Sequence, residues 1–208
     1  MSDRVIVFLD WQNVYMGARE TFCTLAAPHW EGQVNPVQLA QHLTDDSPYD
    51  RTLNQVRIYR GRPDAAVDTK GYAACLRQAG IWEQSALVKT IMRTLRYPRG
   101  WPTAHATGTR PQEKGIDVAL AVDFVTMAVR REYDIGILMS TDTDLKPALE
   151  FVAELTRARG SPRAEVSAWS APGQYNRRLS ISSRNLYCHW VSEHIYSQVS
   201  DHTNYSVP

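Results

Sequence analysis

The chain has 208 residues, 43% of them hydrophobic and 22% charged, with a formal net charge of +1. These values are close to globular averages, so a sizeable core can form in one domain, or in one domain and an extension. No run of about 18 apolar residues is present, which excludes a membrane span. The first residues contain no separate apolar signal core with a cleavage site, so we expect a cytoplasmic protein.

The cysteines exclude two further classes of protein. Cys23, Cys75 and Cys188 are odd in number, lie far apart and form no CxxC pair. This pattern argues against a disulfide framework and against a thiolate zinc site. We therefore expect three idle or buried thiols.

The charge is unevenly spread along the chain. Residues 56–116 contain eleven Lys and Arg but only four Asp and Glu. A segment of this kind is able to follow a phosphate backbone. A solvated surface that is balanced by acid elsewhere explains it equally well, and the sequence leaves both interpretations open.

Apolar runs and alternation predict strands followed by amphipathic helices along most of the chain. The strand segments are 4–10, 53–59, 82–88, 137–139 and 164–169. The helix segments are 14–20, 36–43 after an Asn35-Pro36 start, 65–79 closed by Gly80, 114–133, and 145 to about 160. Residues 91–97 extend the third strand or return as a hairpin arm. We expect a loop over 98–111, a last element over 186–199, helical in character, and a disordered tail over 200–208.

This order of elements predicts an α/β fold with a parallel sheet and helices on both faces. One domain would cover residues 1–199. Ligands bind such sheets outside the carboxyl ends of the strands. Asp10 ends the first strand, Asp142 and Asp144 follow the fourth, and Asp117 opens the helix that leads into the fourth. The sequence therefore predicts a group of carboxylates at one edge of the sheet.

Crowded carboxylates repel each other, and a hard divalent cation relieves that repulsion. Ligation by oxygen alone suits Mg²⁺ or Mn²⁺ rather than zinc. Each acid also has a structural explanation. Asp142 or Asp144 can cap a helix, Asp117 can interact with a helix dipole, and Asp123, about 240° further round the same helix, can be a satisfied surface acid. Asn13 can be a turn residue.

Three motifs in the chain resemble those of the NYN domain, a family of PIN-like nucleases. They are Asp10-x-x-Asn13 after an apolar strand, KGIDVALAVD over 114–123, and STDTD over 140–144. The resemblance covers most of the chain, and the second motif is the most specific. It implies a Rossmann-like α/β/α sandwich, a mainly parallel sheet and metal-dependent RNA cleavage.

By that resemblance Asp10, Asp117 and Asp142 hold the metal, Asp144 completes the cluster, and Asn13 binds near the scissile phosphate. Lys114, Ser140 and Thr141, from the same motifs, are expected to contact the RNA. Two positions depart from the family pattern: Thr141 replaces a usual Gly, and Leu145 replaces a usual Phe. Neither departure removes a carboxylate.

We therefore expect a Mg²⁺- or Mn²⁺-dependent ribonuclease, an endoribonuclease by our reading, in which a metal-activated water attacks the phosphodiester. An alternative is a catalytically weak RNA- or protein-binding module of the same fold. A phosphatase with an aspartyl nucleophile is disfavoured, because Gln12 occupies the position of its second acid. A dinucleotide-binding site is also disfavoured, because no GxGxxG motif follows the first strand. The sequence leaves open whether the chain forms a homo-oligomer or has a regulatory protein partner.

Overall fold

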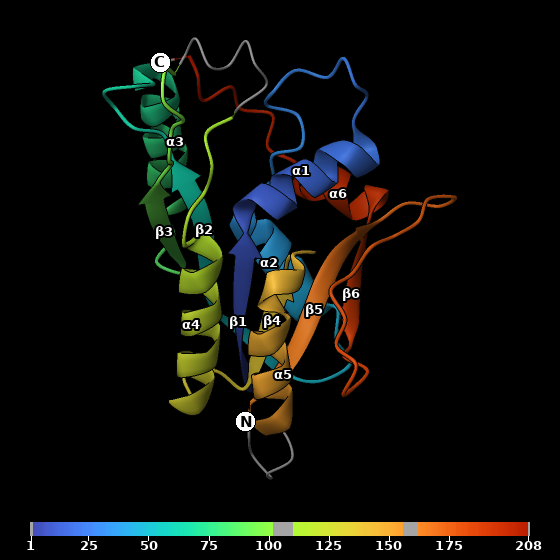
Figure 1. The fold of residues 1–208 in the computed structure, drawn as a ribbon. Helices are drawn as coiled ribbons and strands as arrows, with labels where there is room; N and C mark the ends of the chain where they lie inside the picture. The colour runs from blue at the N-terminus through green and yellow to red at the C-terminus, as the bar shows by residue number, and fades with distance from the viewer. Residues whose placement is uncertain (1, 102–109, 156–161, 208) are drawn as a thin grey trace.

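The computed structural model describes residues 2–101, 110–155 and 162–207, which form an α/β fold around one parallel sheet. The strands run in the order β3-β2-β1-β4-β5-β6 (Figure 1). Their bounds are β1 Asp3–Asp10, β2 Arg51–Arg62, β3 Val88–Thr94, β4 Ile135–Met139, β5 Arg163–Ser170 and β6 Cys188–Ser192. Every neighbouring pair in this order is parallel. The predicted fold class is confirmed.

Helices cover both faces of the sheet and divide the core into two layers. Their bounds are α1 Trp11–Phe22, α2 Pro36–Asp45, α3 Thr69–Trp82, α4 Ile116–Val129, α5 Lys146–Leu155 and α6 Glu193–Val199, with a 3-10 turn, η2, at Thr143–Leu145. Helices α4 and α5 pack on one face, and α1, α2, α3 and α6 contribute to the core on the other (Figure 1). The central strand β1 is buried on both faces from Val5 to Leu9, which explains its unbroken apolar run.

The helix starts follow local chemistry. The Asn35 side chain accepts hydrogen bonds from the backbone N–H groups of Val37 and Gln38, and Pro36 occupies the first turn of α2. A cap of this kind satisfies donors that have no partner inside the helix. The sequence-based prediction of this helix start is confirmed.

The region around β2, α3 and β3 differs from the prediction in its boundaries. Strand β2 continues through Gly61 and Arg62, and α3 begins at Thr69 behind an Asp68 cap and runs past Gly80. Trp82, predicted to begin a strand, ends α3 because its ring packs against Trp11 in the core, with centroids 4.3 Å apart. The third strand is β3, which pairs in parallel with β2, so no hairpin forms.

The C-terminal region also differs from the prediction. The segment expected to be one helical element is divided into β6 and α6. The expected disordered tail instead lies against the domain: Arg77 donates two hydrogen bonds to the Tyr205 carbonyl, at 2.9 and 2.6 Å, and Tyr205 is buried. The Asp201 N–H donates to the Gln33 carbonyl at 2.9 Å. Hydrogen-bond partners supplied by distant segments, the Arg77 side chain and the Gln33 carbonyl, hold the tail, and a tail's composition does not reveal such partners.

Two predicted features extend beyond the described residues. The described residues do not include 102–109, the centre of the predicted loop. They also do not include 156–160, where the helix after β4 was expected to end. Among the described residues, no helix has the length and apolar character that crossing a membrane requires.

Candidate active site

The ends of β1 and β4 lie side by side and bring two motifs together. Leu9 pairs with Met139 in the sheet, so the next residues, Asp10 and Ser140, leave the sheet as neighbours. The Ser140 hydroxyl donates to Asp10 Oδ2 at 2.8 Å. Asp10 is only 2% exposed. The sheet register therefore holds this carboxylate in place from two segments that are 130 residues apart in sequence.

Asn13 links the first and third motifs. Its backbone N–H and its Nδ2 group donate to Asp10 at 3.3 and 2.7 Å. Its Oδ1 accepts a hydrogen bond from the Thr141 hydroxyl at 2.7 Å. Asp10 is also the N-cap of α1. The unusual Thr141 thus supplies a polar contact that fixes Asn13, and the other departure, Leu145, is fully buried in the core beneath.

The carboxylates after β4 have different surroundings. Asp142 Oδ1 accepts the Asp144 backbone N–H at 2.9 Å, so Asp142 caps the 3-10 turn η2. The Asp142 N–H donates to the Ser140 hydroxyl at 3.0 Å. Asp144 is exposed. The capping explanation considered for Asp142 is correct, and it leaves the other oxygen of this carboxylate available.

Asp117 reaches the same place from the other side of β1. It lies in the first turn of α4, two residues after the N-cap Gly115, whose φ of 75° is a left-handed conformation that favours glycine. A cavity of about 460 Å³ is lined by Asp10, Asn13, Asp117 and Asp142 together. Four of the predicted catalytic residues therefore share one cavity at the carboxyl edge of the sheet. Asp144 does not line this cavity.

Negative charge in this cavity is poorly compensated. Burial raises the pKa of Asp10, and the negative charge of Asp117 raises it further. Hydrogen bonds from Ser140 and Asn13 lower it but do not cancel this rise. The pKa of Asp117 is raised by burial and then by the charges of Asp142 and Asp144. Asp144 thus acts on the cluster through its charge although it stands outside the cavity.

Glu113 is a further acid of this cavity that the sequence-based reasoning missed. Its Oε1 accepts the Gly61 backbone N–H at 2.6 Å. Burial raises its pKa, and the charges of Asp10 and Asp117 contribute. A Cβ atom at Gly61 would lie 2.6 Å from Glu113 Oε1, so glycine in β2 makes room for this side chain. The signal that was available is the position of Glu113 directly before the KGID motif.

The donor set of the cavity suits a hard divalent cation, because every side-chain donor there is an oxygen or an amide. The uncompensated charge also favours a cation. Within residues 2–101, 110–155 and 162–207, however, no three His, Cys, Asp or Glu side chains form a group that could hold a metal ion as they stand. The carboxylates converge on one space without closing to ligand distance.

The remaining residues singled out in the motifs have three different surroundings. Asp123 accepts hydrogen bonds from Arg57 and from the Tyr59 hydroxyl, the latter at 2.8 Å. Burial alone would raise the pKa of Asp123, but these hydrogen bonds outweigh it and lower the pKa. It faces away from the cavity, as the helix geometry predicted. Lys114 is exposed. Ser140 is buried and its hydroxyl is engaged with Asp10, so it positions acids from within the site.

Comparisons with known proteins identify the family of the chain. A family model of the NYN domain matches residues 4–167. No curated protein matches the chain. A solved structure described as a protein of unknown function from Vibrio parahaemolyticus RIMD 2210633 is similar at 14% identity and a TM-score of 0.49, covering 82% of this chain and 83% of that chain. Because the family match spans well over half of the sequence, the chain belongs to the NYN domain family of the PIN-like nuclease superfamily.

Proposed function

We propose that this protein is a Mg²⁺- or Mn²⁺-dependent endoribonuclease. Membership of the NYN family indicates a nuclease-type function related to RNA. The observation that carries the finer proposal is the convergence of Asp10, Asp117 and Asp142, from three distant segments, on one cavity with little positive charge inside it. A fold gains no stability from such an arrangement, because like charges there raise each other's pKa.

In the proposed site, Asp10, Asp117 and Asp142 would hold the cation. The chemistry it supplies when bound is activation of a water and neutralisation of charge on the phosphate. The chain's own groups do the rest. Ser140 and the backbone of Asn13 fix the Asp10 carboxylate, and Thr141 orients the Asn13 amide so that its Nδ2 group lies beside Asp10, at the cavity wall. Asp144 strengthens the local negative potential.

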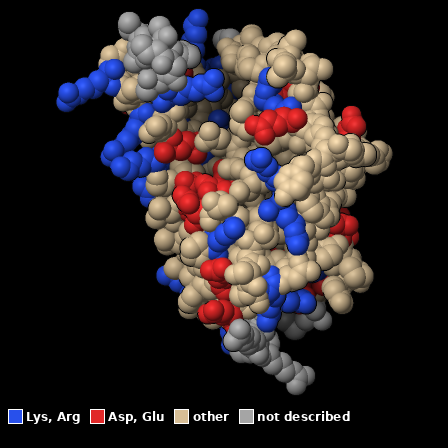
Figure 2. Space-filling view, turned by 45° about the vertical axis from the view of Figure 1, so that its right-hand side comes forward, with Lys and Arg blue, Asp and Glu red and all other residues tan. Residues whose placement is uncertain are grey.

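Exposed cations beside the acidic cavity support RNA as the substrate. We call them the basic rim; its members, each exposed and next to or paired with a segment that lines the cavity, are Arg93, Arg96, Arg110 and Lys114. Arg93 lies close to Gly115 at the start of α4, since its Cδ is 3.8 Å from where a Cβ of that glycine would be. Arg96 exchanges backbone hydrogen bonds with Gln112, at 2.9 Å each. Figure 2 shows acidic side chains near the middle of this face with a larger basic group to one side.

Other cations of the same segment have structural partners. Arg57 pairs with Asp123, the Arg60 guanidinium lies over the Trp82 ring, and Arg77 donates to the Tyr205 carbonyl. The strongly basic composition of 56–116 therefore includes cations with structural partners as well as exposed ones. The basic rim is the exposed group beside the acidic cavity, where Lys and Arg can neutralise phosphates and release counterions.

The experiment that tests the proposal is cleavage of single-stranded and structured RNA with Mn²⁺ or Mg²⁺, by the wild type and by Asp142→Asn. We expect metal-dependent cleavage that excess chelator abolishes and that the substitution reduces by about 1000-fold, because a ligand carboxylate is lost. Glu154→Gln, at an exposed position of α5, is the control and should cleave normally. Cleavage that survives the chelator or Asp142→Asn would overturn the proposal.

One observation favours the alternative, a binding module without catalysis. As they stand, the described carboxylates form no group that could hold a metal. Calorimetric titration with Mn²⁺ separates the two functions. A nuclease binds the ion at this cavity and loses that binding in Asp142→Asn, whereas a binding module binds RNA with no heat from Mn²⁺ at the cluster.

A further inference from the structure

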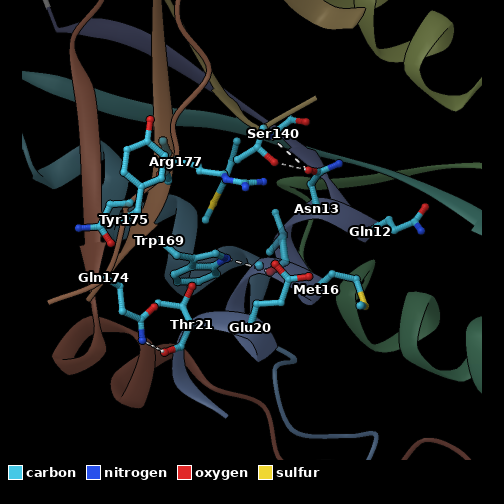
Figure 3. A pocket seen from close by; sticks show the side chains of 17 residues that line it. Gln12, Asn13, Met16, Glu20, Thr21, Ser140, Trp169, Gln174, Tyr175 and Arg177 are labelled. Atoms are coloured by element: carbon cyan, nitrogen blue, oxygen red, sulfur yellow. Dashed lines mark hydrogen bonds between the residues drawn. The ribbon is translucent and has the colours of Figure 1, made fainter. Parts of the chain in front are cut away.

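A second cavity adjoins the acidic one and has no role in the cleavage step described above. Its volume is about 650 Å³, within the usual size range of ligand pockets. It is formed by α1, the ends of β4 and β5, and the segment after β5 that carries Gln174, Tyr175 and Arg177 (Figure 3). Gln12 and Asn13 line both cavities. The two cavities therefore lie on either side of the first turn of α1.

The floor of this cavity is rigid. The Trp169 indole donates its N–H to the Val14 carbonyl at 2.8 Å and is almost buried. Its ring packs so closely on α1 that a Cβ at Gly17 would lie 2.8 Å from Trp169 Cδ1. The segment after β5 is also held, because Asn176 Oδ1 accepts the Ala171 N–H at 3.0 Å and Gln174 donates to the Thr21 carbonyl at 3.3 Å. A cavity of this kind exists before any ligand arrives.

The groups at its mouth are of a different kind. Tyr175 is 89% exposed, an unusual state for an aromatic side chain on an ordered segment. Arg177 is also exposed and extends toward the side where Ser140 and Asn13 lie (Figure 3). Glu20 stands on the opposite wall, on α1. Among the described residues, no hydrogen bond or ion pair engages the side chains of these three.

These three groups lie beside the proposed phosphodiester site and are complementary to one nucleotide. The Tyr175 ring can stack on a base, Arg177 can bind a phosphate, and Glu20 can accept a hydrogen bond from the base. Any of the four nucleobases can stack on a tyrosine ring, because every base has a π-face. Arginine binds phosphate oxygens, and a carboxylate accepts from an exocyclic amino group. A base within a duplex is stacked on its neighbours and does not offer its face.

We propose that this pocket binds one unpaired nucleotide of the RNA, next to the one that is cleaved. The base stacks on Tyr175, Arg177 contacts the phosphate that leads into the acidic cavity, and Glu20 favours bases with an amino group over uracil. The substrate is thus a single-stranded or looped segment. This inference rests on the proposed function, because it assumes that RNA is the substrate. Binding of RNA can nevertheless be measured separately from its cleavage.

The test is fluorescence anisotropy with labelled ten-nucleotide oligo(A), oligo(C) and oligo(U) in chelator, so that no cleavage occurs. We expect Tyr175→Ala and Arg177→Ala each to weaken binding about ten-fold, and Glu20→Gln to reduce the preference for oligo(A) and oligo(C) over oligo(U). Arg177→Ala should also lower the salt dependence of binding by about one ion.

Matched controls are Tyr49→Ala, an exposed tyrosine in the turn before β2, and Arg184→Ala, an exposed arginine that lines a different cavity. Both should bind as the wild type does. Pocket variants that bind like the controls, or that lose affinity equally for a blunt duplex, would overturn the inference. If Tyr175→Ala weakens binding but cleavage proves independent of Asp142, only the proposed nuclease fails; if cleavage needs Asp142 but ignores Tyr175, only the subsite fails.

Discussion

Two groups of ionisable side chains in this protein have opposite character. At the carboxyl edge of the sheet, Asp10, Asp117 and Asp142 share a cavity without a compensating cation. On the α2 side of the sheet, Glu165 accepts two hydrogen bonds from Arg51, at 2.9 and 2.7 Å, and one from His189 at 2.8 Å, and His189 also contacts Asp46. We call these the acidic cavity and the Glu165 network.

The difference is visible in the pKa values. Burial and like charges raise the pKa of Asp10 and of Asp117. Burial acts in the same direction on Glu165, but hydrogen bonds and charge from His189 and Arg51 outweigh it and lower its pKa to about 2. Removing one partner of a buried charge pair is strongly destabilising, whereas buried charges without partners cluster at functional sites. The acidic cavity should therefore govern activity and the Glu165 network should govern folding.

The largest expected effect is on activity, from Asp117→Asn. This change removes a proposed metal ligand and should lower kcat/KM for RNA by about 1000-fold. It also removes the repulsion from Asp142 and Asp144, so the melting temperature should stay the same or rise. Cleavage assays with Mn²⁺ and thermal melts measure the two effects. A variant that melts much earlier would show that Asp117 is structural, and the contrast between the two regions would fail.

The second effect is on stability, from Glu165→Gln. The substitution leaves the Arg51 guanidinium, which is 4% exposed, without its anionic partner. Breaking a buried pair from one side costs about 3 kcal/mol or more, so the free energy of unfolding in urea should fall by that amount. Metal-dependent cleavage below the melting temperature should remain at the wild-type rate. A large loss of kcat in the folded variant is the result that contradicts this division of roles.

The third effect is the pH dependence of stability. Glu165 has a pKa of about 2 in the folded protein against 4.5 as its ordinary value. Its contribution is complete above about pH 4.5 and is lost as the pH falls toward 2, for a total of about 3 kcal/mol. Urea unfolding at several pH values should show this loss in the wild type and a shallower one in Glu165→Gln. Identical pH profiles would remove the Glu165 network as the cause.

The smallest effect is expected from Asp123→Asn, on the same helix as Asp117. Asp123 pairs with Arg57 and Tyr59 and is about one-third exposed, so its loss should cost about 1 kcal/mol of stability. RNA cleavage should not change. Comparison with Asp117→Asn therefore separates two acids, six positions apart on α4, by their surroundings alone. A loss of cleavage near that of Asp117→Asn would place Asp123 in the site.

The sequence pattern predicted the acids at the ends of strands and helices, but it did not predict the other residues that surround the site. Asp10, Asp142 and Asp117 occupy the ends of elements, and such ends are visible as the points where an apolar run or a helical period stops. Glu113 was missed because it precedes a helix and reaches the cavity only by folding over Gly61 in β2. The cavity around Tyr175 was missed because an exposed aromatic residue in a polar segment has no periodicity that marks it.

By itself, the sequence determined the parallel α/β class, the Asn35 cap, the family motifs and the acids that end the strands. These features depend on local periodicity and on residues close in the chain. Tertiary structure decided which charges are compensated. Asp123 meets Arg57, Glu165 meets Arg51, and Thr141 meets Asn13 only through the packing of distant segments. The physical reason is that a charge's environment is set by partners tens to more than a hundred residues away, which strand order and register bring into contact.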